Sequence, residues 1–431
     1  MHRTNNRTSS KLTTVLLGAI AAIVVISIIL FPDEAFRASL EGLTVWWKLV
    51  FPALMPFFIL TELLTGLGVI QGVGMLLTPL MRFIFRLPGV SGWALASGLI
   101  VGFPAGAKIT ANLREKSLIT QFEAERLNAL SHLCSPLFLL TVVGVGFLHS
   151  ASLGATLAVI HYVSALAVGL LLRIRKSRSA GEQLAPSEHS HNHDHHQTAN
   201  GSIWQRSSQA MREAYLEDGR SFGKLLGDSV TSSVQTLMLI GGYMMIFSVI
   251  IHVVTITHAI DIIRLFAGAA MSFFHLHTDM APQWTKALFE IYLGSYSLSQ
   301  TQDIPLVLKI AFISAFLGWG GLSAHAQAAG FHFKTDVRYS PFLIARTLHA
   351  AIAFMTTFLL WKPLESVFAS AEPSFLRLDL NPVTQTAAHT PLEGGHLWTM
   401  WSSVSIQLLL LMGVMILLSL ITNLLVGKKF R

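Results

Sequence analysis

The sequence contains little cysteine and little charge. Cys134 is the single cysteine among 431 residues, which excludes an internal disulfide and any CxxC metal or redox site. Asp, Glu, Lys and Arg together make up 12% of the chain, whereas a soluble domain carries roughly a quarter. A nucleotide-binding loop, a GxSxG elbow, an HExxH pair and a GxGxxG turn are also missing. We therefore exclude an ordinary cytosolic enzyme and an internal ATP-driven motor, and we expect neither enzymatic activity nor a cofactor.

Apolar residues take the place of the missing charge. They make up 52% of the chain, and the mean hydropathy of +0.57 is typical of a polytopic membrane protein. The net charge of +7 fits basic residues that face the cytoplasm and anionic lipid headgroups. Because these basic residues are scattered beside apolar stretches, we expect the lipid bilayer as a partner and no nucleic acid.

Long apolar runs predict an all-α polytopic membrane protein with about eight transmembrane helices plus two broken or re-entrant segments. A crossing needs about 20 predominantly apolar residues. The predicted crossings are 12–31, 46–68, 132–148, 153–172, 230–256, 284–298, 342–361 and 401–425, and the broken segments are 69–107 and 304–330. Basic residues before the first crossing and after the last one place both termini in the cytoplasm. This parity count gives parallel halves, and one miscounted re-entrant segment would make them inverted, so both orientations stay open.

The two halves share one order of features, which predicts an internal two-fold repeat. Matching the breaks pairs Gly102 and Pro104 with Gly318 and Gly320, and matching the acids pairs Glu62 with Glu290. The predicted division is an N-terminal span with a short outside loop (1–44), a first repeat (45–173), a cytoplasmic His-rich linker (174–228), a second repeat (229–361), an outside loop (362–399) and a C-terminal span with a basic tail (400–431). Broken helices at corresponding positions of two halves indicate a transporter binding site.

Glu62 and Glu290 each stand alone in an apolar run. An acid inside a span costs at least about 2.5 kcal/mol on insertion scales, so it usually has a partner or a task. The task is a proton or cation relay, or a hydrogen bond to substrate. The alternative is a structural acid that pairs with a buried Lys or with backbone N–H groups.

The backbone around the breaks predicts an anion site. Glycine and proline interrupt the helix at Gly102, Pro104 and Gly106, and the helix that restarts there directs free N–H groups at the gap. Lys108 adds a positive charge, and Ser323 offers a hydroxyl in the second half. The alternative is a tight interhelical turn with Lys108 at the headgroups. The predicted substrate-binding residues are Glu62, Gly102, Pro104, Gly106, Lys108, Glu290, Gly318, Gly320 and Ser323.

Two further motifs have ordinary interpretations. Ser135 precedes Pro136 and is expected to cap the helix that begins there. Histidines cluster in the linker, at His189, His191, His193, His195 and His196, where a metal role competes with a solvated linker.

Several motifs together resemble one known family, the YlbJ family of sporulation integral membrane proteins. The residues that carry the resemblance are Trp46 to Phe58 (WWKLVFPALMPFF), Thr61 to Leu64 (TELL), Pro88 to Val90 (PGV), Gly102 to Lys108 (GFPAGAK) and Ser131 to Phe138 (SHLCSPLF). The resemblance implies two copies of the nucleoside-recognition or Gate domain, which is similar to portions of concentrative nucleoside transporters. It implies a protein of the mother cell and outer forespore membrane that moves dipicolinic acid toward the forespore. On that pattern Glu62 and Glu290 match the acids of the repeated helices, and the stretch from Gly102 to Lys108 matches the hairpin turn.

These observations favour a permease of a small anion, with dipicolinic acid as the expected substrate. Two alternatives stay open: a nucleoside-type permease, and a non-transporting scaffold or signalling protein of the spore envelope. Metal handling through the linker histidines is a further hypothesis. A homo-oligomer or other spore-membrane proteins are the protein partners that these alternatives allow.

Overall fold

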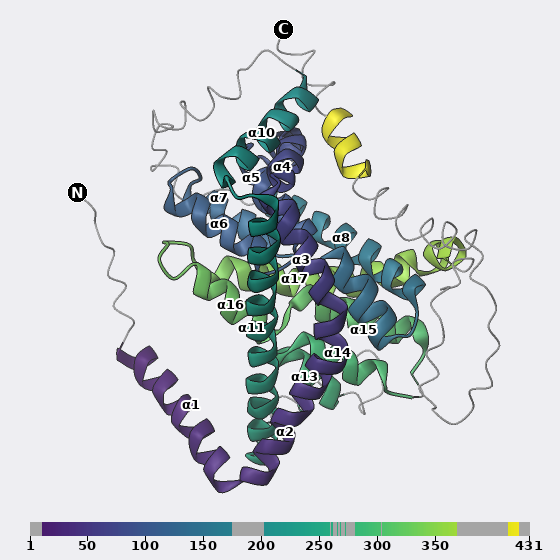
Figure 1. Cartoon of the computed structure of the whole chain (residues 1–431). Coiled ribbons are helices and arrows are strands. Elements are labelled where there is room, and N and C mark those ends of the chain that lie inside the picture. Colours follow the sequence, from purple (N-terminus) through teal and green to yellow (C-terminus); the bar gives the residue numbers. More distant parts are fainter. Residues whose placement is uncertain are drawn as a thin grey trace, which may run out of the picture.

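The computed structural model describes residues 11–174, 202–258, 260–261, 281–302, 304–368 and 413–421, with the isolated positions 265, 268 and 272. All regular structure in these ranges is helical (Figure 1). The first half contains α1 (Lys11–Leu30), α2 (Pro32–Val45), η1 (Trp46–Val50), α3 (Phe51–Gly66), α4 (Val69–Pro79), η2 (Leu80–Phe85), α5 (Ser91–Ile100), α6 (Ala105–Glu115), α7 (Gln121–Ser131), η3 (Phe138–Phe147) and α8 (Ala151–Ile174). The second half contains α10 (Ile203–Asp218), α11 (Phe222–Ile256), α13 (Ala281–Phe289), α14 (Ile291–Ser299), α15 (Leu306–Trp319), α16 (Gly321–Phe331) and α17 (Tyr339–Phe368).

Five helical stretches of the described ranges are long and apolar enough to cross a membrane. They are Pro32–Gly66, Ala151–Ile174, Phe222–Ile256, Leu306–Phe331 and Tyr339–Glu365, and shorter apolar helices accompany them. This result confirms the predicted class, an all-α polytopic membrane protein.

The predicted outside loop before residue 45 is instead a helix. Pro32 occupies the first turn of α2, and Asp33 and Glu34 follow it. Proline suits that position and acids stabilise a helix N-terminus, so this polar stretch begins a helix that continues through η1 into α3. In Figure 1, α1 diverges from the body as a separate arm.

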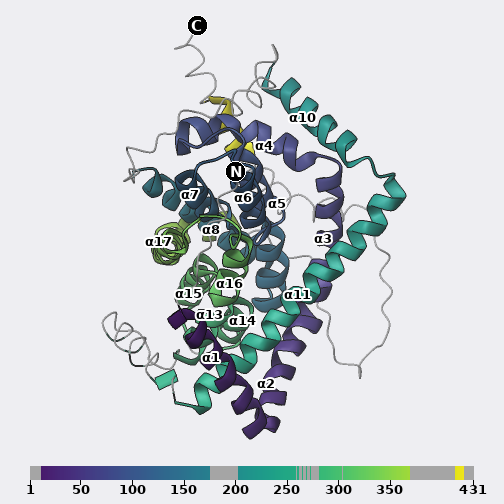
Figure 2. The same ribbon diagram turned by 90° about the vertical axis from the view of Figure 1, so that its left-hand side faces the viewer.

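The first long helices of the two halves pack against each other in opposite directions. Near one end, Ser248 Oγ donates to Ala38 O at 2.7 Å, and further along Trp46 Nε1 donates to Leu237 O at 2.9 Å. Figures 1 and 2 both show α11 alongside α2 and α3.

The last long helices, α8 and α17, are antiparallel as well. Ala345 near the start of α17 packs beside Leu172 near the end of α8, whereas Leu364 packs beside Ala155. Of the two orientations that the sequence left open, the antiparallel packing of both helix pairs favours the inverted repeat over the parallel one that the parity count gave.

Each half contains a helical hairpin followed by a broken helix. In the first half α5 packs along α6, and in the second half α13 packs along α14, where Gly294 meets Ala287. The chain then passes through α7 and η3 with a break at 132–135, or through α15 and α16 with a break at Gly320. Gly102 lies 31 residues before Leu133, and Glu290 lies 30 residues before Gly320, so the spacing in the two halves differs by one residue.

This order corrects three sequence predictions. Residues 284–298 were expected to cross the membrane, but they form the second hairpin, while Leu306–Phe331 is a candidate span rather than a re-entrant segment. The break at residues 132–135 therefore corresponds to the break at Gly320. Gly102, at the tip of the first hairpin, corresponds to Glu290 and not to Gly318. The mismatch arises because glycine marks a break without saying whether the chain turns back or continues.

Caps define the ends of the short helices between the breaks. The polar stretch 108–126 divides into α6 and α7, because Thr120 and Glu123 form a capping box at the start of α7. The predicted cap at Ser135 is confirmed, since Phe138 N donates to Ser135 Oγ at 3.3 Å.

Ion pairs join the two halves at the turns that follow α6 and α16. Arg338 Nε lies 2.6 Å from Glu125 Oε1, and the Glu125 side chain is 1% exposed. Arg114 binds Asp336 through two hydrogen bonds of 2.8 Å. Because Glu125 and Arg114 belong to the first half and Arg338 and Asp336 to the second, these pairs fix the halves against each other.

A candidate binding site where the helix breaks meet

The tip of the first hairpin rests on the break of the first broken helix. Phe103 N donates to Leu133 O at 2.7 Å. Gly102 has a φ of +92°, and a Cβ there would lie 2.9 Å from Ser135 N, so this position requires glycine. Sequence reasoning identified the break through Gly102 and Pro104, and Pro104 forms the N-cap of α6.

The tip of the second hairpin rests on the second break in the same way. Glu290 has an extended backbone and caps α14: Leu293 N donates to its Oε2 at 2.9 Å. Ser323 Oγ, in the first turn of α16, donates to Oε1 of the same carboxylate at 3.4 Å. Trp319 Nε1 completes the junction by donating to Leu288 O at 3.0 Å. Two predicted site residues, Glu290 and Ser323, are thus in direct contact.

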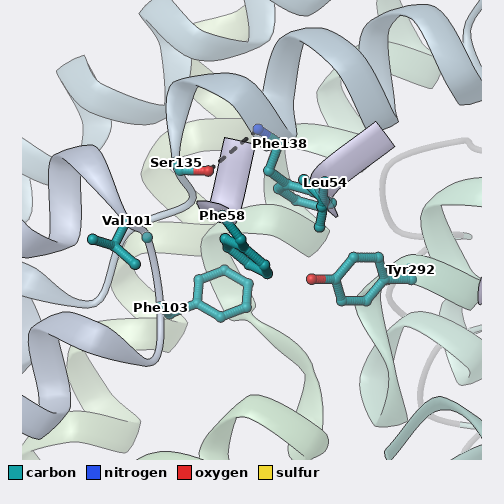
Figure 3. A pocket seen from close by; sticks show the side chains of 8 residues that line it. Leu54, Phe58, Val101, Phe103, Ser135, Phe138 and Tyr292 are labelled. Atoms are coloured by element: carbon teal, nitrogen blue, oxygen red, sulfur yellow. Dashed lines mark hydrogen bonds between the residues drawn. The ribbon is translucent and has the colours of Figure 1, made fainter. Parts of the chain in front are cut away.

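A pocket lies between these structures (Figure 3). Its cavity volume is about 10 Å³, which is room for about one water molecule, so an organic ligand would have to widen it. Its lining comes from α3, the first hairpin tip, the first break, η3 and α14, and consists of Leu54, Phe58, Val101, Gly102, Phe103, Ser135, Phe138 and Tyr292. Four of the eight lining residues are aromatic and none carries a formal charge, so a ligand that widened the pocket would meet aromatic rings. The Tyr292 hydroxyl points toward Phe58 and Phe103 in Figure 3.

The two predicted acids occupy different environments. Glu290 is 2% exposed and bonded as described. Glu62 is half-buried in the continuous helix α3. Leu54, Phe58 and Glu62 are spaced four residues apart, so they lie on one face of this helix. Glu62 does not line the pocket but lies one helical turn from Phe58, which does, whereas Glu290 caps the helix that carries Tyr292.

The other predicted residues divide between packing and the surface. A Cβ on Gly106 would lie 2.9 Å from Ser131 Cβ, and one on Gly318 would lie 2.9 Å from Ala350 Cα, so both glycines allow close helix packing. Gly320 sits beside the Arg346 guanidinium. Lys108 is exposed on α6 and does not line the pocket.

Sequence reasoning missed a buried arginine at the centre of the molecule. Arg346 is 1% exposed and lies on α17. Its Nη1 donates to His132 O at 2.8 Å, its Nη2 to Leu317 O at 3.1 Å and its Nε to Trp319 O at 3.4 Å. Arg346 thus binds the carbonyl ends of α7 and α15, where helix dipoles favour a cation. The available signal was an arginine inside the apolar run 342–361.

Four histidines with at most 2% exposure lie near this arginine: His132, His161, His325 and His349. Cys134 N donates to His161 Nε2 at 3.1 Å, which places the proton of a neutral His161 on Nδ1. His349 Nε2 lies 3.1 Å from His161 O, and the two rings are 4.7 Å apart. His325 binds Tyr339 Oη and Trp319 O through its two nitrogens.

No metal centre emerges from the part of the chain that the structure describes. Its His, Cys, Asp and Glu residues form no group of three that could hold an ion. The linker histidines at 189, 191, 193, 195 and 196 lie outside the described residues, so their metal role stays a prediction.

Comparison with known proteins identifies the family. The Gate family, described as nucleoside recognition, matches residues 47–166. The sporulation integral membrane protein YlbJ of Bacillus subtilis (strain 168) is 42% identical over 355 residues, which cover 82% of this chain and 84% of that protein. The chain belongs to the YlbJ family.

The YlbJ family assignment makes this chain an integral membrane protein of a sporulation family. The Gate match includes seven of the eight pocket-lining residues, all except Tyr292 of the second half. No solved structure matches the chain.

Proposed function

We propose that the protein is a permease that carries a small organic anion, dipicolinic acid in the first place, across a membrane of the sporulating cell. The observation that carries this proposal is the pocket to which both halves contribute, at the tip of the first hairpin and at α14 of the second. Non-helical backbone at membrane depth is tolerated where it is buried in protein or lines a cavity, and transporter sites commonly form at broken helices.

The pocket chemistry supports a flat aromatic substrate. Phe58, Phe103, Phe138 and Tyr292 present rings that can stack against a pyridine ring or contact its edge. Free N–H groups at the start of α6, just after Phe103, favour a carboxylate. In this proposal the two termini are cytoplasmic and the protein works in the outer forespore membrane.

A nucleoside-type permease is the second candidate. Its support is the Gate match, whose description is nucleoside recognition and which spans most of the pocket lining. A nucleobase is also flat and aromatic, so the uncharged lining fits it equally well. Net charge distinguishes the two substrates.

Counterflow in proteoliposomes tests the proposal. Purified protein is reconstituted with unlabelled dipicolinate inside, and uptake of labelled dipicolinate is measured with a nucleoside as competitor. We expect saturable uptake of dipicolinate. Uptake of the nucleoside alone would support the second candidate. No flux of either compound by folded protein would overturn the permease proposal in favour of a scaffold.

Glu62→Gln tests the pocket assignment. The substitution keeps the size of the side chain but removes a half-buried carboxylate beside the pocket, so we expect flux to fall at least tenfold with an unchanged thermal midpoint. Glu115→Gln, at an exposed acid at the end of α6, is the matched control and should leave flux unchanged. Equal flux in wild type and Glu62→Gln would remove Glu62 from the site.

A further inference from the structure

The charge of Arg346 has no acidic partner. In the ranges that the structure describes, no carboxylate forms an ion pair with this guanidinium, and its bonds go to three backbone carbonyls. These bonds use three of its five N–H donors. A buried, unpaired charge is costly, so the surroundings of Arg346 favour an anion.

The two imidazole nitrogens of His132 lack hydrogen-bond partners within the described ranges. The side chain is 0% exposed, and neither Nδ1 nor Nε2 has a hydrogen-bond partner among the described residues. A buried polar group without a hydrogen-bond partner destabilises the folded state, so its presence needs an explanation such as a role in binding. The backbone carbonyl oxygen of the same residue, His132, accepts a hydrogen bond of 2.8 Å from Arg346 Nη1.

Phe103 separates His132 from the pocket. The two rings stack with centroids 5.1 Å apart and planes inclined by 16°. Phe103 also lines the pocket and is half-buried next to Gly102 at the hairpin tip, whereas His132 does not line it. A second ring neighbour of His132, Phe342, meets the imidazole edge-on at 5.0 Å and does not line the pocket. Phe103 is therefore the ring that contacts both the pocket and the imidazole, and a rotation of Phe103 is the movement that would join them.

We infer that His132 and Arg346 form a carboxylate subsite behind Phe103, which closes the subsite when no ligand is bound. His132 supplies a hydrogen-bond donor and Arg346 supplies positive charge, while the aromatic pocket holds the ring of the ligand. The ligand class is a small aromatic carboxylate. The inference rests on the proposed function for its substrate, and it adds two residues and a moving side chain.

His132→Phe separates ligand binding from folding. Phenylalanine preserves the stacked ring and removes two unpartnered nitrogens, so the thermal midpoint of the free protein should stay the same or rise. The dissociation constant for dipicolinate should rise about tenfold or more. His161→Phe is the matched control, because it deletes a bond from Cys134 N that is made in the structure and should lower the midpoint. A clearly lower midpoint for His132→Phe, or unchanged affinity, would overturn the inference.

A panel of ligands distinguishes this inference from the proposed function. Thermal stabilisation by dipicolinate and by isophthalate, which lacks the ring nitrogen, would support a carboxylate subsite. Stabilisation by an uncharged nucleoside but by neither anion would overturn the subsite while leaving a nucleoside permease. Stabilisation by none of the three would overturn both. Binding of dipicolinate with equal affinity by wild type and His132→Phe would overturn the subsite alone.

Chemical modification tests the role of Phe103 without any flux measurement. Diethyl pyrocarbonate acylates accessible imidazoles, and peptide mapping reports the extent at His132 alone. We expect Phe103→Leu to increase modification of His132 at least threefold and dipicolinate to suppress it. Phe342→Leu, on the side away from the pocket, should leave it unchanged. Equal reactivity in wild type and Phe103→Leu would contradict the proposed closure.

Discussion

At the scale of single residues, one carboxylate connects two helix starts. Glu290 accepts a hydrogen bond from Leu293 N at the start of α14 and another from Ser323 Oγ at the start of α16. Its buried carboxylate is therefore a structural cap at the tip of the second hairpin. That role is compatible with transport, because the cap orients α14, which places Tyr292 in the pocket.

Removal of this cap should destabilise the protein. We expect Glu290→Ala to lower the free energy of unfolding by about 1–2 kcal/mol, since it deletes an N-cap and leaves Leu293 N unpaired. Ser323→Ala loses only the longer bond of 3.4 Å and should cost less, about 0.5–1 kcal/mol. Thermal unfolding of the purified variants measures both effects. If Glu290→Ala and Ser323→Ala unfold at the wild-type midpoint, the cap contributes nothing.

Sequence reasoning identified Glu290 but not its conformation. An acid in an apolar run was enough to single it out. The run from Trp284 to Leu298 is mostly apolar and contains neither proline nor a glycine next to the acid. The helix ends there because the carboxylate caps α14 and meets Ser323, which lies 33 residues later. Arg346 was overlooked for a related reason: its partners are carbonyl oxygens, which every sequence contains.

At the scale of elements, close packing at small residues holds each hairpin. Gly98 of α5 and Gly106 of α6 both approach the backbone of Ser131 at the end of α7. A side chain at either position would push the hairpin away from the helix on which its tip rests. The glycines of the first hairpin thus contribute to its position as well as to its turn.

Gly106→Ala tests this packing. The added methyl group would meet Ser131, so we expect the free energy of unfolding to fall by about 1–3 kcal/mol, as for other overpacked sites. Gly242→Ala in α11 is the matched control, because no atom lies within 4 Å of the new Cβ. Alanine favours a helix more than glycine does, so this control should be neutral or stabilised by up to about 1 kcal/mol. Equal unfolding of the two variants would show that Gly106 has no packing role.

The breaks themselves were predictable, but their geometry was not. Gly102 and Pro104 interrupt helical hydrogen bonding whatever surrounds them. Whether the chain then reverses depends on distant contacts, such as Gly294 against Ala287 in the second hairpin. For this reason Gly320 was paired with Pro104, although it corresponds to the break after α7.

At the scale of the whole molecule, the inverted repeat places corresponding turns on opposite faces. The turn after the first hairpin, at Ser117, adjoins the ion pairs of Arg114 and Glu125. The turn after the second hairpin, at Gln300, leads into α15, and the other end of α15 is the break at Gly320. Parallel halves would have placed both turns on one face.

Cysteine labelling distinguishes these arrangements. Cys134 is buried, so the native chain provides a silent background. We expect Ser117→Cys and Gln300→Cys, both at exposed positions, to react with an impermeant maleimide from opposite sides of oriented vesicles. Ser117→Cys should react from the cytoplasmic side, where basic residues gather. Reaction of both variants from the same side would contradict the inverted repeat.

The all-α membrane class was predictable because lipid imposes a strong compositional constraint. Apolar runs without charge specify helices that cross a bilayer, and the described ranges contain five such stretches. Orientation was harder, because a short hairpin counted as a crossing reverses the direction of the chain that follows it. Residues 284–298 were that hairpin, and Leu306–Phe331 was counted as re-entrant although it is a candidate span, so the two errors offset each other after residue 331.

Ion pairs between the halves also make the two possible arrangements of the repeat unequal in free energy. An inverted repeat with identical halves has two arrangements of equal free energy, related by a two-fold rotation and open to opposite sides. Arg338–Glu125 and Arg114–Asp336 join the halves at the turns after α6 and α16, whereas the more exposed pair Lys286–Glu41 joins α13 to α2. The first two pairs, one of which has a buried carboxylate, therefore favour the arrangement in which those turns are held together. A conformational cycle of this molecule would therefore spend unequal times in its two states, and salt would shorten the longer one by screening the Arg114–Asp336 pair.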